Sequence, residues 1–175
     1  MNLIQKTLCA GLLALGTASP LLAQEEVPRV ALYTDWSVFN PTNPKECFIA
    51  SAPTQTEAQR NGQSVDVRRD AIRLYVASRP GEGTTNEIAF TGGYPFRDGS
   101  TVSIKIGNET FELFTEGEFA WPASPAEDAK IIASMQRGAK AVVSGVSSRG
   151  TTTIDSFSLI GFSDALKDSN GRCAN

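Results

Sequence analysis

The sequence predicts a mostly β protein, an antiparallel β-sandwich with one interior helix and a short C-terminal helix. Eight or nine short segments alternate apolar and polar residues and are separated by turn-forming residues. Only one interior stretch, from Ser124 to Gly138, has the start and stop signals of a helix. No internal repeat or second domain interrupts the pattern. A single sandwich is therefore expected, with a small barrel as the alternative.

The first 23 residues are predicted to be a secretory signal peptide. Lys6 provides a positive start, residues 7–22 are an apolar stretch broken by glycine and proline, and Ala23 is a small residue at the cleavage position. A membrane-spanning helix is disfavoured because the stretch is too short and interrupted to cross roughly 30 Å of hydrocarbon. We expect an exported protein of the periplasm, outer membrane or cell surface. Residues 24–35 would be a mature N-terminal segment, and residues 36–175 one domain.

The expected strands follow the alternation of apolar residues. A first strand over residues 30–39 places Val30, Leu32, Trp36 and Val38 on one face. Residues 51–63 are polar and predict a loop. Tight turns are expected at residues 107–108 and 116–117, where glycine adjoins a polar residue. Further strands are expected at residues 46–50, 65–67, 72–78, 86–91, 101–106, 110–114 and 119–121.

The sequence contains signals for both the start and the end of the interior helix. Ser124 is placed as the N-cap, Pro125 as the first helical residue, and Glu127 as the acid three residues after the cap. Gly138 is placed to end the helix. Ser163 is expected to cap a short last helix that runs through Lys167. The apolar stripe of the interior helix consists of Ile131, Ile132 and Met135.

Residues 140–162 are predicted to form a β-hairpin around which the chain is organised. Its strands are expected at residues 141–146 and 151–159, joined by a turn over residues 147–150 in which Gly150 is free to take a positive φ. In the second strand, Asp155, Phe157 and Leu159 share one face because side chains alternate across a strand.

Charge and cysteine content limit the compartment and the partners. The formal net charge of −3 becomes about −4 once Lys6 leaves with the signal peptide, which argues against nucleic acid and against an anionic lipid surface. Cys47 and Cys173 remain after Cys9 is removed, and in an oxidising compartment this isolated pair predicts a disulfide. A free reactive thiol is the disfavoured alternative.

The absence of histidine excludes several catalytic systems. Serine and cysteine nucleophiles that depend on histidine are excluded, and two mature cysteines cannot supply a four-ligand zinc site. The sequence also contains no phosphate-binding glycine loop and no calcium loop, so we expect no cofactor and no enzymatic activity. Carboxylate-dependent hydrolysis remains as a disfavoured alternative, through Asp155 with Glu112, Glu116 or Glu118.

Four residues are candidates for an interaction site or for a structural motif, namely Arg149, Asp155, Tyr94 and Phe96. Arg149, in the hairpin turn, is a candidate for capturing an anion or a partner. The favoured alternative is a structural arginine that pairs with Asp155 or Asp164, or bonds to loop carbonyls. Tyr94 and Phe96 are candidates for stacking on a sugar. Trp36 and Trp121 carry the same ambiguity, and we expect both in the core.

Several segments together resemble the invasion associated locus B family. They are Gly92-Gly93-Tyr94-Pro95-Phe96, residues 111–114 with Ala120-Trp121, Ser147-Ser148-Arg149-Gly150-Thr151, Asp155, and Ser158-Leu159 with Gly161-Phe162. The resemblance extends from about Trp36 to Cys173. It implies an immunoglobulin-like β-sandwich exported by Gram-negative bacteria, in a family whose founding member is associated with entry into host cells. The family has no catalytic motif to transfer.

These observations leave three functional hypotheses. The first is a non-enzymatic protein of the cell envelope that binds an envelope or host macromolecule. The second is a carbohydrate-binding module that uses Tyr94, Phe96 and the acidic hairpin. The third is the carboxylate-dependent hydrolase.

Overall fold

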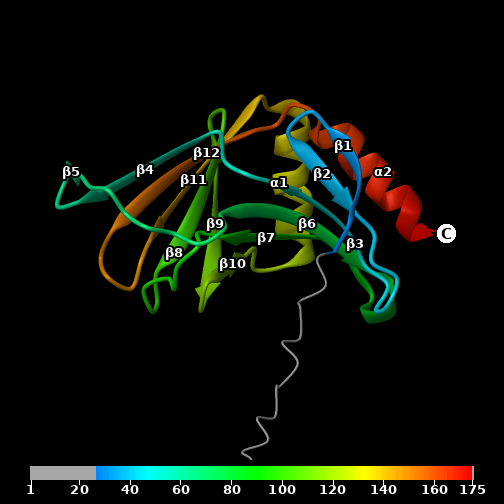
Figure 1. The fold of residues 1–175 in the computed structure, drawn as a ribbon, viewed down its shortest axis with the longest axis horizontal. Coiled ribbons are helices and arrows are strands. Elements are labelled where there is room, and N and C mark those ends of the chain that lie inside the picture. The colour runs from blue at the N-terminus through cyan, green and yellow to red at the C-terminus, as the bar shows by residue number, and fades with distance from the viewer. Residues whose placement is uncertain (1–26, 175) are drawn as a thin grey trace, which may run out of the picture.

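A computed structural model describes residues 27–174, so the predicted signal peptide lies outside the described residues. Twelve antiparallel strands form one sheet that does not close into a barrel, and two α-helices accompany it, which confirms the predicted fold class. Figure 1 shows these elements. The sheet has the order β1-β2-β3-β6-β7-β10-β9-β8-β11-β12-β4-β5. The elements are β1 Arg29–Tyr33, β2 Trp36–Phe39, β3 Cys47–Ser51, β4 Gln55–Arg60, β5 Gln63–Ser64, β6 Arg73–Arg79, the 3-10 helix Pro80–Glu82, β7 Thr84–Thr91, β8 Thr101–Ile106, β9 Glu109–Glu116, β10 Phe119–Trp121, α1 Pro125–Arg137, β11 Lys140–Val146, β12 Thr152–Ser158 and α2 Phe162–Ala174.

The sheet folds over so that its two halves face each other across a shared core. Phe90 on β7 meets Phe157 on β12 edge to face, with ring centroids 6.1 Å apart. The chain itself passes from one half to the other, because β3 leads through a short connection into β4, which pairs with β12. The Trp36 indole donates a 3.0 Å hydrogen bond to the carbonyl oxygen of Ser158 and so ties β2 to the end of β12.

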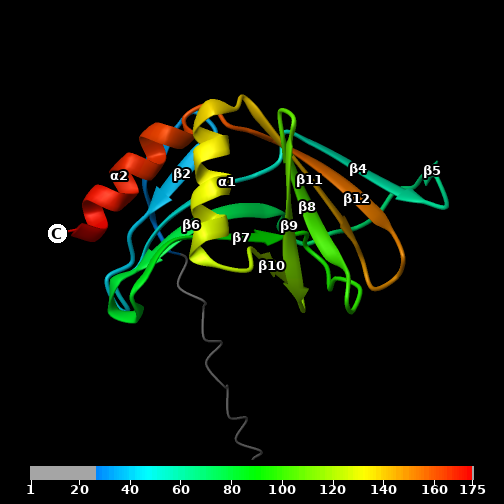
Figure 2. The same cartoon turned by 180° about the vertical axis from the view of Figure 1, so that it is seen from behind.

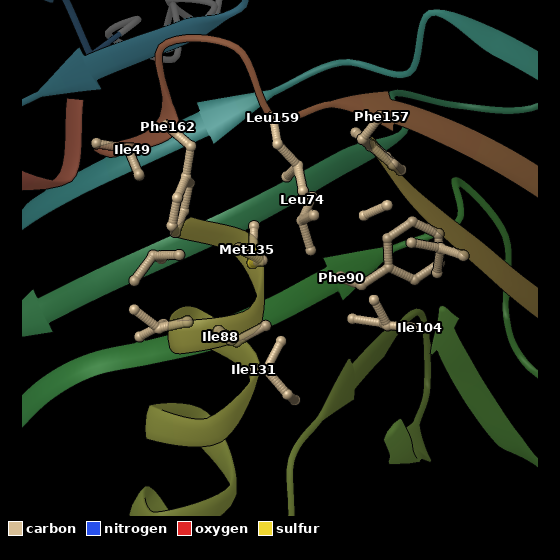
Figure 3. Close-up of a cluster of buried hydrophobic side chains, with 14 of the residues drawn as sticks. Ile49, Leu74, Ile88, Phe90, Ile104, Ile131, Met135, Phe157, Leu159 and Phe162 are labelled. Carbon is tan, nitrogen blue, oxygen red and sulfur yellow. The ribbon is translucent and has the colours of Figure 1, made fainter. Parts of the chain in front are cut away.

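The two helices complete the core beside the folded sheet. Figure 2 shows α1 and α2 on the same side of the long strands β6 and β7. In Figure 3, Ile131 and Met135 of α1 lie beside Ile88 of β7, and Phe162 at the start of α2 lies near Ile49 of β3. Burial of these apolar side chains is the main stabilising contribution, at roughly 25 cal/mol for each Å² removed from water.

The interior helix begins and ends where its sequence signals predict. The Ser124 side chain accepts a hydrogen bond from the backbone N–H of Glu127, and Pro125 occupies the first turn, where its missing N–H is not needed. The Gly138 N–H bonds back to the carbonyls of Ser134 and Met135 and closes the last turn. The predicted interior helix is therefore confirmed.

The single strand expected over residues 30–39 is wrong. The chain turns at Thr34, whose φ of 51° is unusual for a branched residue, and forms the two antiparallel strands β1 and β2. Val30 and Leu32 are consequently exposed, whereas Trp36 and Val38 are fully buried. Apolar and polar residues do alternate along this segment, but the turn places its two halves in different environments.

The loop expected over residues 51–63 is also wrong in its second part. Strands β4 and β5 occupy residues 55–60 and 63–64, and the turn between them is Asn61-Gly62 with φ values of 52° and 76°. Asn-Gly with positive φ at both residues is a strong hairpin signal. Strand β4 lacks an apolar pattern in the sequence, since Ala58 is the only side chain that it buries. The strand expected at residues 65–67 is not formed, and residues 65–72 instead connect β5 to β6.

The C-terminal helix is longer than predicted. It runs from Phe162 to Ala174 instead of ending at Lys167, and its buried side includes Ala165, Leu166 and Ser169. The extension carries Cys173 to Cys47 on β3, and the predicted disulfide is confirmed. No helix among the described residues is long and apolar enough to cross a membrane.

The two tryptophans differ in environment. Trp36 is fully buried against Phe162, as expected. Trp121 is only half-buried, on the outer face of β10, so its expected place in the core is wrong. The neighbouring Ala120 is the residue of β10 that points into the core, because successive side chains of a strand point to opposite faces.

Reducing the disulfide is expected to destabilise the protein. Cys47 and Cys173 are 126 residues apart, so the loop-entropy model assigns the bond up to about 5 kcal/mol. The melting temperature measured by circular dichroism should therefore fall by several degrees or more in reductant. An unchanged melting temperature, after thiol titration has confirmed two free cysteines, would contradict this expectation.

Candidate functional site

Two segments that are distant in the sequence meet at one place in the fold. Phe96 forms an isolated β-bridge with Ser147, and the Ser148 N–H donates a 2.9 Å hydrogen bond to the Pro95 carbonyl. These contacts hold the loop after β7 against the turn between β11 and β12. That turn has the predicted form, since the Gly150 N–H bonds to the Ser147 carbonyl at 2.8 Å.

A cleft of about 620 Å³ opens where the two segments meet. A third segment forms its remaining wall, namely the connection over residues 65–72, which returns from the β4–β5 tip to β6 in Figure 1. The sequence predicted the first two walls as separate loops but did not indicate that the third one joins them. The lining residues are Arg60, Asp66, Val67, Arg68, Arg69, Asp70, Gly93, Tyr94, Pro95, Glu118, Ser147, Ser148, Arg149, Thr151 and Thr153.

A buried ion pair fastens this third wall to the sheet. The Arg69 guanidinium donates to both carboxylate oxygens of Asp155, at 2.8 and 2.6 Å. The Asp155 side chain is 0% exposed and that of Arg69 8% exposed. Arg69 also donates from Nε to the Gly92 carbonyl at 2.8 Å and lies over the Tyr94 ring, 5.1 Å from its centroid. These interactions satisfy a guanidinium that would be costly to bury alone.

The backbone of the same wall lies close to Gly93. The Asp70 N–H donates to the Gly93 carbonyl at 3.0 Å, and a side chain at Gly93 would collide with the Asp70 backbone. Gly93 also has a φ of 72°, where residues with a Cβ are strained. The glycine is therefore required both for its conformation and for the close approach of the connection.

Tyr94 and Phe96 are placed differently from the sugar platform that we considered. Phe96 is buried in the core, and its ring packs edge to face on Tyr94. Tyr94 is half-buried, and its hydroxyl forms a 2.5 Å hydrogen bond with the Thr153 hydroxyl. Burial raises the pKa of Tyr94, which keeps the phenol neutral. Tyr94 lines the cleft, whereas Phe96 supports it from behind.

The pairing expected for Arg149 is wrong. Asp155 is occupied by Arg69, which was not a candidate in the sequence, and Asp164 lies on α2. Arg149 is exposed at the mouth of the cleft and forms no ion pair with any residue in the range 27–174. Its guanidinium is therefore available to a partner.

The rim of the cleft has mixed charge. Arg60 and Arg68 are exposed beside Arg149, and Arg60 donates to the Thr151 hydroxyl at 2.7 Å. Asp66, Asp70 and Glu118 line the same cleft, so three carboxylates accompany the three exposed guanidinium groups. Complementary arrangements of both signs give a surface specificity for one orientation of a partner.

The acids proposed for hydrolysis do not converge. Asp155 has both oxygens bonded to Arg69 and no exposed surface. Burial raises its pKa, and the hydrogen bonds from Arg69 oppose that shift. Of the three glutamates, only Glu118 lines the cleft, where the buried Asp155 offers it no carboxylate partner. Glu112 accepts from Thr101 on β9, and Glu116 lines a separate hollow. Within residues 27–174, no group of three His, Cys, Asp or Glu side chains is placed to hold a metal ion.

Breaking the buried pair is expected to be costly. Arg69→Met should lower the free energy of unfolding by about 3–5 kcal/mol, because it leaves the Asp155 carboxylate buried without a partner. The double variant Arg69→Met, Asp155→Leu should recover part of that loss. Urea denaturation of both single variants and the double variant measures this coupling. The exposed Arg149→Met is the control, with an expected change within about 0.5 kcal/mol. Additive losses in the double variant would refute the coupling.

Comparison with known proteins assigns the chain to a family. Neither the search of curated proteins nor that of solved structures finds a match. A family profile described as invasion associated locus B (IalB) protein matches residues 36–170, which include both halves of the sheet and all the cleft residues. The chain therefore belongs to the invasion associated locus B family.

Proposed function

We propose that this chain is an exported, non-catalytic protein of the cell envelope that binds a macromolecule through the cleft at Arg149. The observation that carries the proposal is the cleft itself. Its rim has three exposed guanidinium groups, of which that of Arg149 has no partner among the described residues. A charged group left exposed on a rigid turn is a ready site for a carboxylate or phosphate of a partner.

The construction of the cleft supports binding more than catalysis. Its walls are held by backbone hydrogen bonds and by the Arg69–Asp155 pair, so the rim is preorganised. The family segments around Tyr94 and Arg149 form two of these walls. The family name refers to invasion, and a host macromolecule is accordingly one of the partners that we consider, with an envelope component as the other.

Export is supported by the signal pattern of residues 1–23 and by the Cys47–Cys173 disulfide. We expect the protein isolated from the bacterial envelope to begin at Gln24, as measured by intact mass after osmotic-shock fractionation. Recovery of the uncleaved chain in the cytoplasmic fraction would contradict export.

Partner binding at the cleft is tested by photocrosslinking in cells. A photoreactive amino acid at Ser148, which is exposed on the rim, should give an adduct of defined mass with one partner. Arg149→Glu should abolish this adduct, because it reverses the charge at the mouth of the cleft. Arg137→Glu is the matched control, since Arg137 is an exposed arginine on α1 outside the cleft. Equal adduct yields in the two variants, or no adduct above background in several growth conditions, would refute the proposal.

A further inference from the structure

The outer face of the central strands carries a second site, which we call the aromatic slot. Strands β3, β6, β7 and β10 lie side by side there. A cavity of about 290 Å³ opens between their outward-facing side chains. The aromatic slot is formed by Phe48 of β3, Tyr75 and Ala77 of β6, Ala89 of β7, and Phe119 and Trp121 of β10. It shares no lining residue with the cleft at Arg149.

Two alanines create the slot by leaving a gap between aromatic rings. In the strand register Tyr75 lies opposite Ala89, and Phe48 lies opposite Ala77. Strand β7 separates the Tyr75 ring on β6 from the rings on β10, so these two rows are two strand spacings apart, roughly 9–10 Å. Carbon atoms in contact are about 3.5–4.0 Å apart. The gap therefore has room for one extended side chain in contact with both rows.

The aromatic rings at the β10 side of the slot are incompletely covered by the fold. Phe119 is 40% exposed and the adjacent Phe114 is 49% exposed. Trp121 lies between them, 5.7 Å from each ring centroid. Contiguous exposed aromatic side chains mark interaction surfaces.

The charges around the slot select the partner. Arg79 at one end donates to Glu46, Glu82 and Glu87, so three carboxylates share one guanidinium and two negative charges remain in surplus. A neighbouring hollow of about 590 Å³ shares Glu87 and Trp121 with the slot and adds Glu116 and Asp128 without a basic residue. Arg73, the other base on this face of β6, donates to the Ile72 carbonyl and keeps its charge, so two guanidinium groups face the four carboxylates of Glu46, Glu82, Glu87 and Glu116. The slot is therefore aromatic and set in a negative field.

We propose that the aromatic slot binds a lysine or arginine side chain of a partner protein. The aliphatic stem lies between the rings over Ala77 and Ala89, and the cationic head lies at the end that carries Glu46 and Glu87. Aromatic faces attract a cation, and a long basic side chain covers apolar surface with its stem. A neutral saccharide would also stack on the rings, but the surplus negative charge would not strengthen its binding.

The test titrates the purified oxidised protein with a capped hexalysine peptide at low ionic strength. Calorimetry measures the affinity, and the fluorescence of Trp121 reports the site, since Trp36 is fully buried. Phe119→Ser removes a wall of the slot, and Ala89→Leu fills the slot. Neither substitution changes the charge of the protein. Each should weaken hexalysine binding by roughly fivefold or more, the loss expected for a cation–π contact of about 1 kcal/mol.

Two controls make each outcome decisive. Ile160→Ser removes another exposed apolar side chain, and Arg149→Lys alters the separate cleft without changing the charge of the protein; both should bind hexalysine as the wild type does. A melting temperature equal to that of the wild type shows that a variant folds. If one slot variant fails to fold, the other one alone tests the proposal. Hexalysine binding that is absent, or equal in the wild type and both slot variants, would overturn the proposal. Binding of a neutral cellohexaose probe without hexalysine binding would also overturn it and assign the slot to saccharides.

Discussion

The candidate site depends on the buried ion pair between Arg69 and Asp155. A guanidinium and a carboxylate are both expensive to remove from water, and here each satisfies the other through two parallel hydrogen bonds. Arg69 is carried by a connection without regular structure, and the pair is what fastens this connection to β12. Without it, the Gly92–Gly93 backbone would lose its closest neighbour and the cleft would lose one wall.

The same interaction joins several of the segments that resemble the family. The Gly92 carbonyl accepts a hydrogen bond from Arg69, and Gly93 leaves space for the backbone of Asp70. The Arg69 guanidinium lies over the Tyr94 ring and is neutralised by Asp155. Among the interaction candidates Arg149, Asp155, Tyr94 and Phe96, only Arg149 is exposed on the rim of the cleft. The potential for binding therefore lies in the rim residues that the buried network holds in place, since the network itself has no free group.

The two surfaces proposed for binding are chemically different. The cleft presents exposed guanidinium groups among carboxylates, whereas the aromatic slot presents rings with an excess of carboxylates. They share no lining residue, so a variant in one leaves the other intact. The slot was not foreseen because Trp121 shows the same alternation as a core residue. Which face of β10 is covered depends on elements elsewhere in the chain.

The sequence alone determined the strand-rich class, most strands, the boundaries of α1 and the Cys47–Cys173 pair, because alternation, capping and cysteine count are local or compositional signals. It also contained the Asn61-Gly62 turn, which identifies a hairpin even where β4 is polar. Only the tertiary structure decided that Asp155 pairs with Arg69. These residues are 86 positions apart, and nothing local distinguishes Arg69 from Arg68 or Arg149 as the partner. The fold selects Arg69 because its connection crosses the sheet where Asp155 faces inward, and this long-range geometry leaves Arg149 free.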